Sequence, residues 1–270
     1  MKKIYLLMML LATVFVACSD DDKDDDNKEA SWEIKIGVKI DWDDQDVRLG
    51  LSGSMPESID WGDGSTSNGQ PNFDYDEVDE DDDRDYGYMH EYNKGSYTIT
   101  IKGKGEIQLS CGDDNPLTSL DVSKCTELTN LDCGWTGGAL TSLDLSKCIK
   151  LNYLKCTENS LSTLDLSNCT ELVYLECNEN RLTSLNISTC AKLSYLACRD
   201  NFLTTLDPRN CTKLQTLDCA GNDFSDNAMT SLYNNLPNRT EEAVGIIYLY
   251  KSDAQGNIEI AKNKNWTFEE

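Results

Sequence analysis

Residues 117–223 contain five consecutive copies of one pattern, and this repetition constrains the fold more than any other feature of the chain. The last four copies are 21 residues long, and the first carries two extra residues near Trp135. The copies share the pattern L-x-x-L-x-L-x-x-C-x-x-L-x-x-L-x-C, in which Val122, Ile187 and Pro208 replace the third leucine of the first, fourth and fifth copies. A fixed period of this length predicts a solenoid, in which each coil buries its apolar residues against its neighbours. Ten or eleven residues per half-copy leave little room for a helix, so we expect a thin, mostly β solenoid.

The second half of each copy continues as L-x-x-L-x-C-x-x-N, and this motif resembles the leucine-rich-repeat family and, less closely, bacterial internalin-type repeats. The resemblance implies an inward ladder of asparagines whose amides satisfy the backbone of the turns. Its members are Asn115, Asn159, Asn180, Asn201 and Asn222. The first copy has Gly137-Gly138 in place of the asparagine and should be irregular. Because Leu109–Asn115 already reads as half a repeat, we place the solenoid at 109–223, fed directly by the preceding domain.

Eleven of the twelve cysteines lie in or beside the repeats, at two fixed phases eight residues apart. In an exported chain such a pattern is compatible with a disulfide framework. The second phase, however, occupies inward positions that other repeats fill with leucine. Inward side chains in parallel register also point side by side and not at each other. We therefore interpret these cysteines as free, buried, small apolar residues.

The first seventeen residues carry two lysines, an apolar run and small residues ahead of Cys18. This is the pattern of a secretory signal that is removed from the mature protein. With a cysteine directly after Val16-Ala17, it resembles a bacterial lipoprotein signal (1–17), which implies that Cys18 is lipidated; the alternative is an ordinary signal peptide. Residues 18–30 add a dense acidic tract that predicts a disordered tether. The tract resembles the surface-export signal of Bacteroidetes lipoproteins, although a simple solvated spacer would look the same.

Residues 31–108 show short alternating strands separated by turn signals, which favours a small β-sandwich. The alternation is clearest in 32–40 and 97–101, and the glycines of 62–64 suit a tight turn. The residues IDWGDGS (59–65), His90-Glu-Tyr92 and KGSYTITIKG (94–103) resemble the PKD family of immunoglobulin-like domains. The resemblance implies a non-catalytic spacer or contact module.

The acidic run 74–85 within this domain invites a calcium hypothesis, because Ca²⁺ takes six to eight oxygen ligands. The spacing does not follow an EF-hand, since Arg84 stands where glycine is needed, so we favour a solvated loop.

His90 is the only histidine, and no Ser or Cys nucleophile is tied to it by spacing. We interpret it as structural. One histidine and scattered cysteines give no zinc ligand cluster, and we predict neither a metal nor a cofactor.

Residues 224–270 predict an α/β cap that covers the last coil. Ser225 or Asp226 can cap a helix that ends before Pro237, residues 243–250 read as a strand, and residues 258–266 read as a short helix. This tail resembles the caps of Bacteroidetes leucine-rich lipoproteins. The complete prediction is a mainly β chain: a small PKD/immunoglobulin-like β-sandwich, then a leucine-rich-repeat solenoid with an α/β C-terminal cap.

The outward positions beside the L-x-C strands are the candidate binding residues. One row contains three tyrosines, and mixed polar residues form the adjacent rows. The candidates are Tyr153, Tyr174, Tyr195, Lys155, Glu176, Asn178 and Arg199. A tyrosine ladder suits recognition of a sugar or a protein surface. The alternative is cross-strand pairing that only stabilises the sheet.

The balance of 48 acidic against 24 basic residues argues against nucleic acid as a partner. We expect a monomeric, non-enzymatic lipoprotein, anchored in the outer membrane only through its N-terminal lipid and exposed at the cell surface. Its repeat face should bind an extracellular protein or glycan. The alternative is a structural or assembly component that docks permanently on another envelope protein. An enzymatic function is disfavoured, because no paired carboxylates, nucleophile–base spacing or phosphate loop stands out.

Overall fold

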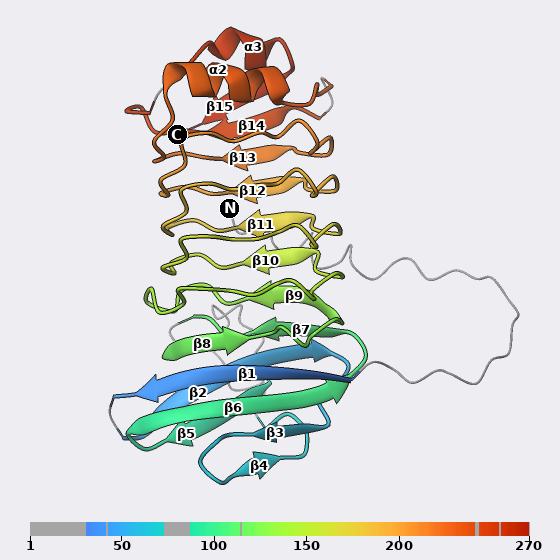
Figure 1. Cartoon of the computed structure of the whole chain (residues 1–270), viewed down its shortest axis with the longest axis vertical. Helices are drawn as coiled ribbons and strands as arrows, with labels where there is room; N and C mark the ends of the chain where they lie inside the picture. Colours follow the sequence, from blue (N-terminus) through green and yellow to red (C-terminus); the bar gives the residue numbers. More distant parts are fainter. Residues whose placement is uncertain are drawn as a thin grey trace, which may run out of the picture.

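The computed structural model describes residues 31–269 except 42, 73–86, 114, 241–242 and 254. These residues form one elongated body, with a β-sandwich at one end, a stack of coils in the middle and two helices at the other end (Figure 1). None of the helices in these ranges has the length and apolar composition needed to cross a bilayer. The fold is mainly β, as predicted.

One sheet of the sandwich contains, among the described residues, five strands in the order β4-β3-β6-β1-β8. They are β1 (Ser31–Ile40), β3 (Ser58–Asp60), β4 (Thr66–Ser67), β6 (Gly95–Lys104) and β8 (Leu117–Asp121). β1 pairs with β6 in antiparallel register along its whole length. The alternation predicted for β1 is confirmed by its buried residues, which include Ile34, Ile36, Val38 and Ile40.

The other sheet runs from the sandwich through the solenoid to the cap, with ten strands in the described part of the chain. Its order is β5 (Tyr88–Tyr92), β2 (Gln45–Gly53), β7 (Ile107–Ser110), β9 (Leu128–Asp132), β10 (Tyr153–Lys155), β11 (Tyr174–Glu176), β12 (Tyr195–Ala197), β13 (Thr216–Asp218), β14 (Gly245–Tyr248) and β15 (Trp266–Glu269). β7 pairs antiparallel with β2 and parallel with β9. The predicted boundary at residue 108 therefore falls inside a strand that belongs to both parts.

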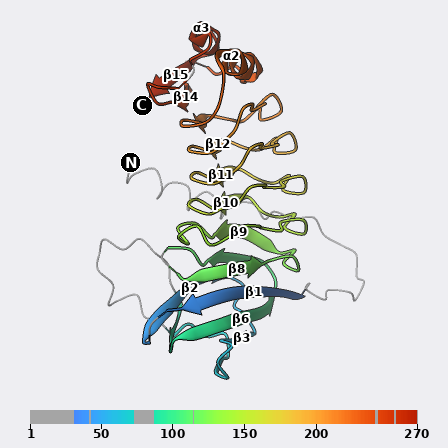
Figure 2. The same cartoon turned by 60° about the vertical axis from the view of Figure 1, so that its left-hand side comes forward.

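Each coil contributes one short strand to this sheet, and successive strands pair in parallel at the repeat period. The central leucine of each strand, such as Leu154 or Leu175, points inward and is fully buried. Figure 2 shows the coils edge-on, as flattened loops stacked between the sandwich and the cap. No described residue between 111 and 223 is helical, so the predicted thin, mostly β solenoid is confirmed.

The similar sequences of the two half-copies predict that the L-x-L and L-x-C segments are both extended, but the structure distinguishes them. The first such segment is strand β8, because β1 of the sandwich lies beside it as a pairing partner. In the later copies the segment is not a strand. In the first copy and in later ones the aspartate of this segment turns the chain: Asp121 accepts a hydrogen bond from the backbone N–H of Ser123 at 3.0 Å, and Asp144 accepts one from that of Ser146 at 2.9 Å.

The asparagine ladder is confirmed. Asn180 Nδ2 donates to the carbonyl of Cys156 in the preceding coil at 2.9 Å, and its Oδ1 accepts from the backbone N–H of Leu161 at 3.0 Å. The same pattern recurs at Asn159, Asn201 and Asn222. Asn115 instead exchanges two hydrogen bonds with the backbone of Arg48 in β2. A sandwich strand thus takes the place of a preceding coil.

The repeat cysteines are confirmed as free and buried: none of the eleven described forms a disulfide. Burial raises the pKa of Cys148 and of Cys169 to about 12. Some thiols donate weak hydrogen bonds to the neighbouring coil, as Cys211 Sγ does to the Ile187 carbonyl at 3.6 Å. These side chains are therefore packing groups with little thiolate at neutral pH.

The cap consists of α2 (Asp226–Asn235), β14, α3 (Ile258–Lys262) and β15. Ser225 caps α2 by accepting a hydrogen bond from the N–H of Ala228 at 3.2 Å. Trp266 is buried at the start of β15, and its Nε1 donates to the Pro237 carbonyl at 2.8 Å. The predicted helices and the strand are present, but two are shorter than expected: the strand over 243–250 is β14, and the helix over 258–266 is α3, which ends at Lys262, so that Trp266 begins β15 instead.

The turn predicted at 62–64 is present in the sandwich, with Gly62 and Gly64 at φ of 83° and 96°. The Trp61 N–H donates to the Ser65 carbonyl at 3.1 Å and closes this turn. A β-sandwich of this kind agrees with the expected fold, whereas membership of the PKD family stays a prediction. The acidic run 74–85, with its calcium alternative, lies outside the described residues.

Candidate functional site

We define the sheet face as the outward side chains of β9 to β13, together with the residue that follows each strand's cysteine. The strand pairing places the candidate residues in straight rows. The first row is Asn130, Tyr153, Tyr174, Tyr195 and Thr216, and the second is Asp132, Lys155, Glu176, Ala197 and Asp218. The third row continues beyond the cysteines with Gly134, Thr157, Asn178, Arg199 and Ala220. All seven sequence-predicted residues therefore share one surface.

The three tyrosines of the first row form a face-to-face stack. The ring centroids of Tyr153 and Tyr174 are 4.5 Å apart with an interplanar angle of 11°, and those of Tyr174 and Tyr195 are 4.4 Å apart at 3°. Tyr174 is only 7% exposed. Its ring faces are covered by its two neighbours, so a sugar cannot stack on them. What this row offers to solvent is the edges of the outer two rings.

The hydroxyl of Tyr174 is also engaged, because it donates a hydrogen bond to Glu176 Oε2 at 2.7 Å. Burial, followed by the charge of the Glu176 carboxylate, raises the pKa of Tyr174 far above that of a free phenol. The other Glu176 oxygen, Oε1, accepts from the Thr157 hydroxyl at 3.2 Å. Tyr174 and Glu176 therefore stabilise the sheet, in agreement with the alternative that the tyrosine row serves cross-strand pairing.

Lys155 and Arg199 are the two basic residues of the sheet face. Lys155 Nζ lies 3.2 Å from Asp132 Oδ2. Burial lowers the pKa of Lys155, but Asp132 and nearby carboxylates outweigh this effect and leave the pKa above its ordinary value. Arg199 contacts Glu179 at 3.6 Å and Asp200 at 3.3 Å. Both cations are partly exposed and already paired with carboxylates.

Asn178 is buried, and its Oδ1 accepts a hydrogen bond from the backbone N–H of Arg199 at 2.8 Å. It holds the third row together and presents little to a ligand. Of the seven candidates, five are partly exposed, namely Tyr153, Lys155, Glu176, Tyr195 and Arg199, and two, Tyr174 and Asn178, are buried.

Sequence reasoning did not single out Trp135 as a binding residue. Its side chain is 43% exposed, and its backbone has a φ of 58°, a left-handed conformation that is rare for a bulky residue. The signal was visible in the sequence as the two extra residues of the first copy. Tyr250, at the edge of the cap, was missed as well; its hydroxyl donates to Asp200 Oδ2 at 3.0 Å.

The sandwich brings His90 beside a serine and an aspartate, which spacing alone did not predict. His90 Nε2 lies 2.8 Å from Asp63 Oδ2 and 3.3 Å from Ser65 Oγ, while Ser65 Oγ is 2.6 Å from Asp63 Oδ1. Hydrogen bonds from Ser65 and then His90 hold the pKa of Asp63 well below its ordinary value.

This contact does not have the geometry of a catalytic triad, in which the acid and the serine bind opposite ring nitrogens. Here the contacts to Asp63 and to Ser65 both use Nε2 of His90. The imidazole also stacks on Trp61, with centroids 4.8 Å apart and an interplanar angle of 12°. The arrangement fastens the 61–65 turn to β5 and agrees with the structural interpretation of His90.

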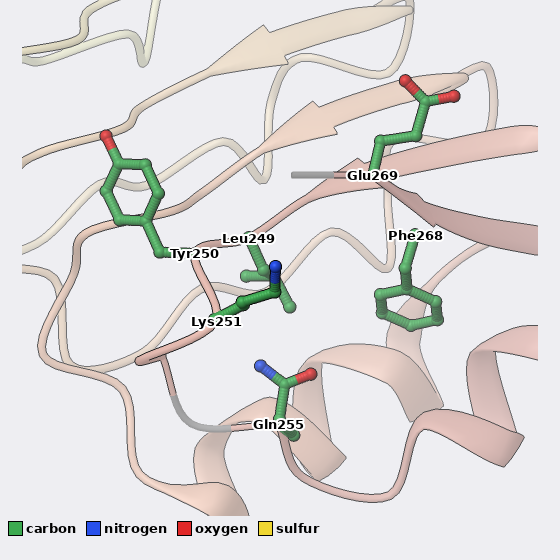
Figure 3. A pocket seen from close by; sticks show the side chains of 6 residues that line it. All are labelled: Leu249, Tyr250, Lys251, Gln255, Phe268 and Glu269. Atoms are coloured by element: carbon green, nitrogen blue, oxygen red, sulfur yellow. The ribbon is translucent and has the colours of Figure 1, made fainter.

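A shallow hollow lies in the cap, lined by Leu249, Tyr250, Lys251, Gln255, Phe268 and Glu269 (Figure 3). Lys251 and Gln255 supply polar groups, and Leu249 and Phe268 supply the apolar wall. No group of three or more metal-ligating side chains occurs in the described ranges.

No protein-family model and no curated protein matches this sequence. Among solved structures, the chain is similar to the functional domain of InlJ from Listeria monocytogenes, described as including a cysteine ladder. The two share 27% identity at a TM-score of 0.47, over 56% of this chain and 32% of that one. It is also similar to internalin C2 from the same organism, with 23% identity and a TM-score of 0.37 over 53% of this chain and 62% of that one.

A third similar structure is a leucine-rich-repeat protein of Leptospira interrogans, with 24% identity and a TM-score of 0.39 over 54% of this chain and 38% of that one. The chain spans less than two thirds of the length of each of these three structures. Its own columns of leucine, cysteine and asparagine, observed above, make its central region a solenoid of the leucine-rich-repeat type.

Proposed function

We propose that this chain is a non-catalytic binding protein that recognises a protein partner on its sheet face. The observation that carries the proposal is the division of the coils into two kinds of position. Leucine, cysteine and asparagine face inward and build the stack, whereas the outward rows vary from coil to coil and are partly exposed at Tyr153, Lys155, Glu176, Tyr195 and Arg199. Uncovered aromatic edges beside charged groups suit the mixed chemistry of a protein surface.

The stacked tyrosines favour a protein over a glycan as the ligand. Carbohydrate recognition by aromatic residues needs an open ring face, and the two faces of Tyr174 are covered. Tyr153 and Tyr195 each keep an exposed edge, and the paired cations Lys155 and Arg199 lie in the same two coils as these tyrosines. Such a surface offers polar and aromatic contacts over several coils.

We further propose that the chain acts at the cell surface, anchored through a lipid on Cys18. The support is in the sequence: a lipoprotein-like signal over 1–17 and the acidic tract of 19–30. The tether would hold the sandwich and the solenoid away from the outer membrane, with the sheet face free to meet a partner. Permanent docking on another envelope protein is the alternative, and it would give stoichiometric co-purification from membranes.

The test compares the wild-type protein with the double variant Tyr153→Asn, Tyr195→Thr. Asparagine and threonine occupy the same row at Asn130 and Thr216, so the sheet tolerates them. Ile149→Thr is the matched control, because it changes an exposed residue away from the sheet face to the threonine found there in other copies.

The purified proteins are screened for binding to immobilised matrix proteins and polysaccharides. We expect the wild type and the Ile149→Thr control to bind a protein on the panel, and the double variant to lose that binding. Equal binding by all three would dismiss the sheet face, and binding restricted to polysaccharides would dismiss the protein ligand.

A further inference from the structure

A second surface runs along the edge of the sheet face, formed by the residue two positions after each second-phase cysteine. We call it the turn column; its members are Asp113, Trp135, Glu158, Glu179, Asp200 and Gly221. Every member has a positive φ, between 52° and 64°. Each non-glycine member donates its backbone N–H to the coil above, as Glu158 does to the Asn178 carbonyl at 3.1 Å and Glu179 to the Arg199 carbonyl at 2.9 Å. The side chains are therefore stacked in neighbouring coils.

The composition of this column is costly for folding. A left-handed backbone costs a non-glycine residue about 1–2 kcal/mol. Glycine avoids that cost and is present at Gly221, which shows that the turn accepts it. Glu158 and Glu179 place like charges in neighbouring coils, whereas Arg199 forms ion pairs with both Glu179 and Asp200. Strained residues that the fold does not need are found where function needs them.

The acidic charge of the solenoid is concentrated on this side. The turn column and the second row together carry seven carboxylates: four in the column, plus Asp132, Glu176 and Asp218. Only Lys155 and Arg199 oppose them. In the rest of the described part of 111–223, seven carboxylates are balanced by seven Lys and Arg residues. The excess of negative charge in the solenoid therefore lies on one face and does not simply reflect the net charge of the whole chain.

Trp135 adds an aromatic anchor within this acidic surface. It lies between Asp113 and Glu158 in the turn column, and its side chain is 43% exposed. A basic side chain placed over such a ring gains a cation–π contact together with attraction to the carboxylates on either side. A neutral or acidic partner gains neither.

We propose that the turn column and the adjoining sheet face bind a partner through a basic, Arg- or Lys-rich polypeptide segment, with Trp135 contacting a cationic side chain. This inference rests on the proposed function, because it names the chemistry of the protein partner. Charge complementarity of this kind sets which partners are accepted and how fast they associate, and it weakens as salt rises.

The test uses a fluorescently labelled octa-arginine peptide and the full chain, at low and at physiological salt. The turn variant combines Glu158→Gln, Glu179→Gln and Asp200→Asn. The matched control combines Asp121→Asn, Asp144→Asn and Asp165→Asn, and thus removes the same number of charges. Asparagine is tolerated there, because Asn186 occupies that position in a later copy and makes the same turn hydrogen bond. A thermal melt confirms that both variants are folded.

We expect the wild type to bind the peptide more weakly as salt rises, and the turn variant to bind it about tenfold more weakly than the control does. Trp135→Gly should also weaken binding, while it relieves the strained backbone and does not lower the melting temperature. If the turn variant and the control lose the same amount of affinity for the peptide, binding depends only on the net charge of the protein, and the inference is overturned. Absence of wild-type binding, or preference for an acidic heparin fragment, would overturn it too.

Failure of this inference is distinguishable from failure of the proposed function. If the wild type does not bind octa-arginine but captures a matrix protein, and the double tyrosine variant loses that capture, the basic partner is refuted. The sheet face then remains the binding site. A wild type that binds octa-arginine through the turn column, with capture that is insensitive to the tyrosine changes, would place the partner on the turn column and refute the tyrosine rows.

Discussion

The asparagine ladder makes a quantitative prediction for the variant Asn180→Ala. The change leaves the buried N–H of Leu161 without its hydrogen-bond acceptor. It also removes the 2.9 Å hydrogen bond from Asn180 Nδ2 to the Cys156 carbonyl. That carbonyl still accepts a hydrogen bond from Asn159 Nδ2. A buried donor left unsatisfied costs about 1–3 kcal/mol and a lost hydrogen bond about 1 kcal/mol. We therefore expect the free energy of unfolding to fall by about 3 kcal/mol. For a chain of this size, that corresponds to a decrease in melting temperature of about 6–12 °C.

The assay is thermal unfolding followed by circular dichroism, with Asn168→Ala as the control. Asn168 is also an asparagine that bridges two coils, through a 2.9 Å bond to the Ser146 carbonyl, but it is exposed. Water replaces that bond, so the control should lose about 1 kcal/mol or less. Hydrogen exchange at the Leu161 amide should accelerate in Asn180→Ala alone. A melting temperature no lower than that of the control would refute the assignment of the ladder as a stabilising element.

Three further predictions concern separate parts of the chain. The eleven repeat thiols should be unreactive toward Ellman's reagent in the native protein and should all titrate after denaturation, because burial raises their pKa; few titratable thiols in denatured protein would indicate disulfides. The depressed pKa of Asp63 contributes stability above its unfolded pKa of about 3.9, and that stability is lost as pH falls through the folded value. The melting temperature of Asp63→Asn should therefore lie below that of the wild type at neutral pH, and the difference should shrink as pH falls below about 3.9; a constant difference would contradict this account. Cys18→Ser should abolish incorporation of labelled palmitate and release the protein from membranes; retained label would place the lipid elsewhere.

The regular features of the solenoid could be predicted from the sequence because each depends on local periodicity. The inward leucines, the asparagine ladder and the rows of the sheet face all follow from a fixed 21-residue period, since parallel coils in register place equivalent residues side by side. The same reasoning located the helix capped by Ser225 and the strand that continues from the sandwich into the stack.

Orientation and long-range contacts could not be predicted in this way. The row positions of Tyr153, Tyr174 and Tyr195 were evident, but the stacking that covers their ring faces depends on rotamers in three coils. The approach of Ser65 to His90 joins positions 25 residues apart in the sequence. The left-handed backbone at Trp135 recurs at the repeat period in the whole turn column, but that position has no constant residue type, so no sequence pattern indicated it.

The central claim is that a protein partner meets the sheet face, and site-specific photo-crosslinking tests it most directly. A benzoylphenylalanine replaces Tyr153 in one protein and, as the control, Ile149 in another; both positions are accessible, but only the first lies on the sheet face. Each protein is irradiated with the matrix-protein panel. The account predicts a crosslinked adduct from position 153 and none from position 149. Equal adducts from both positions, or an adduct from position 149 alone, would contradict it.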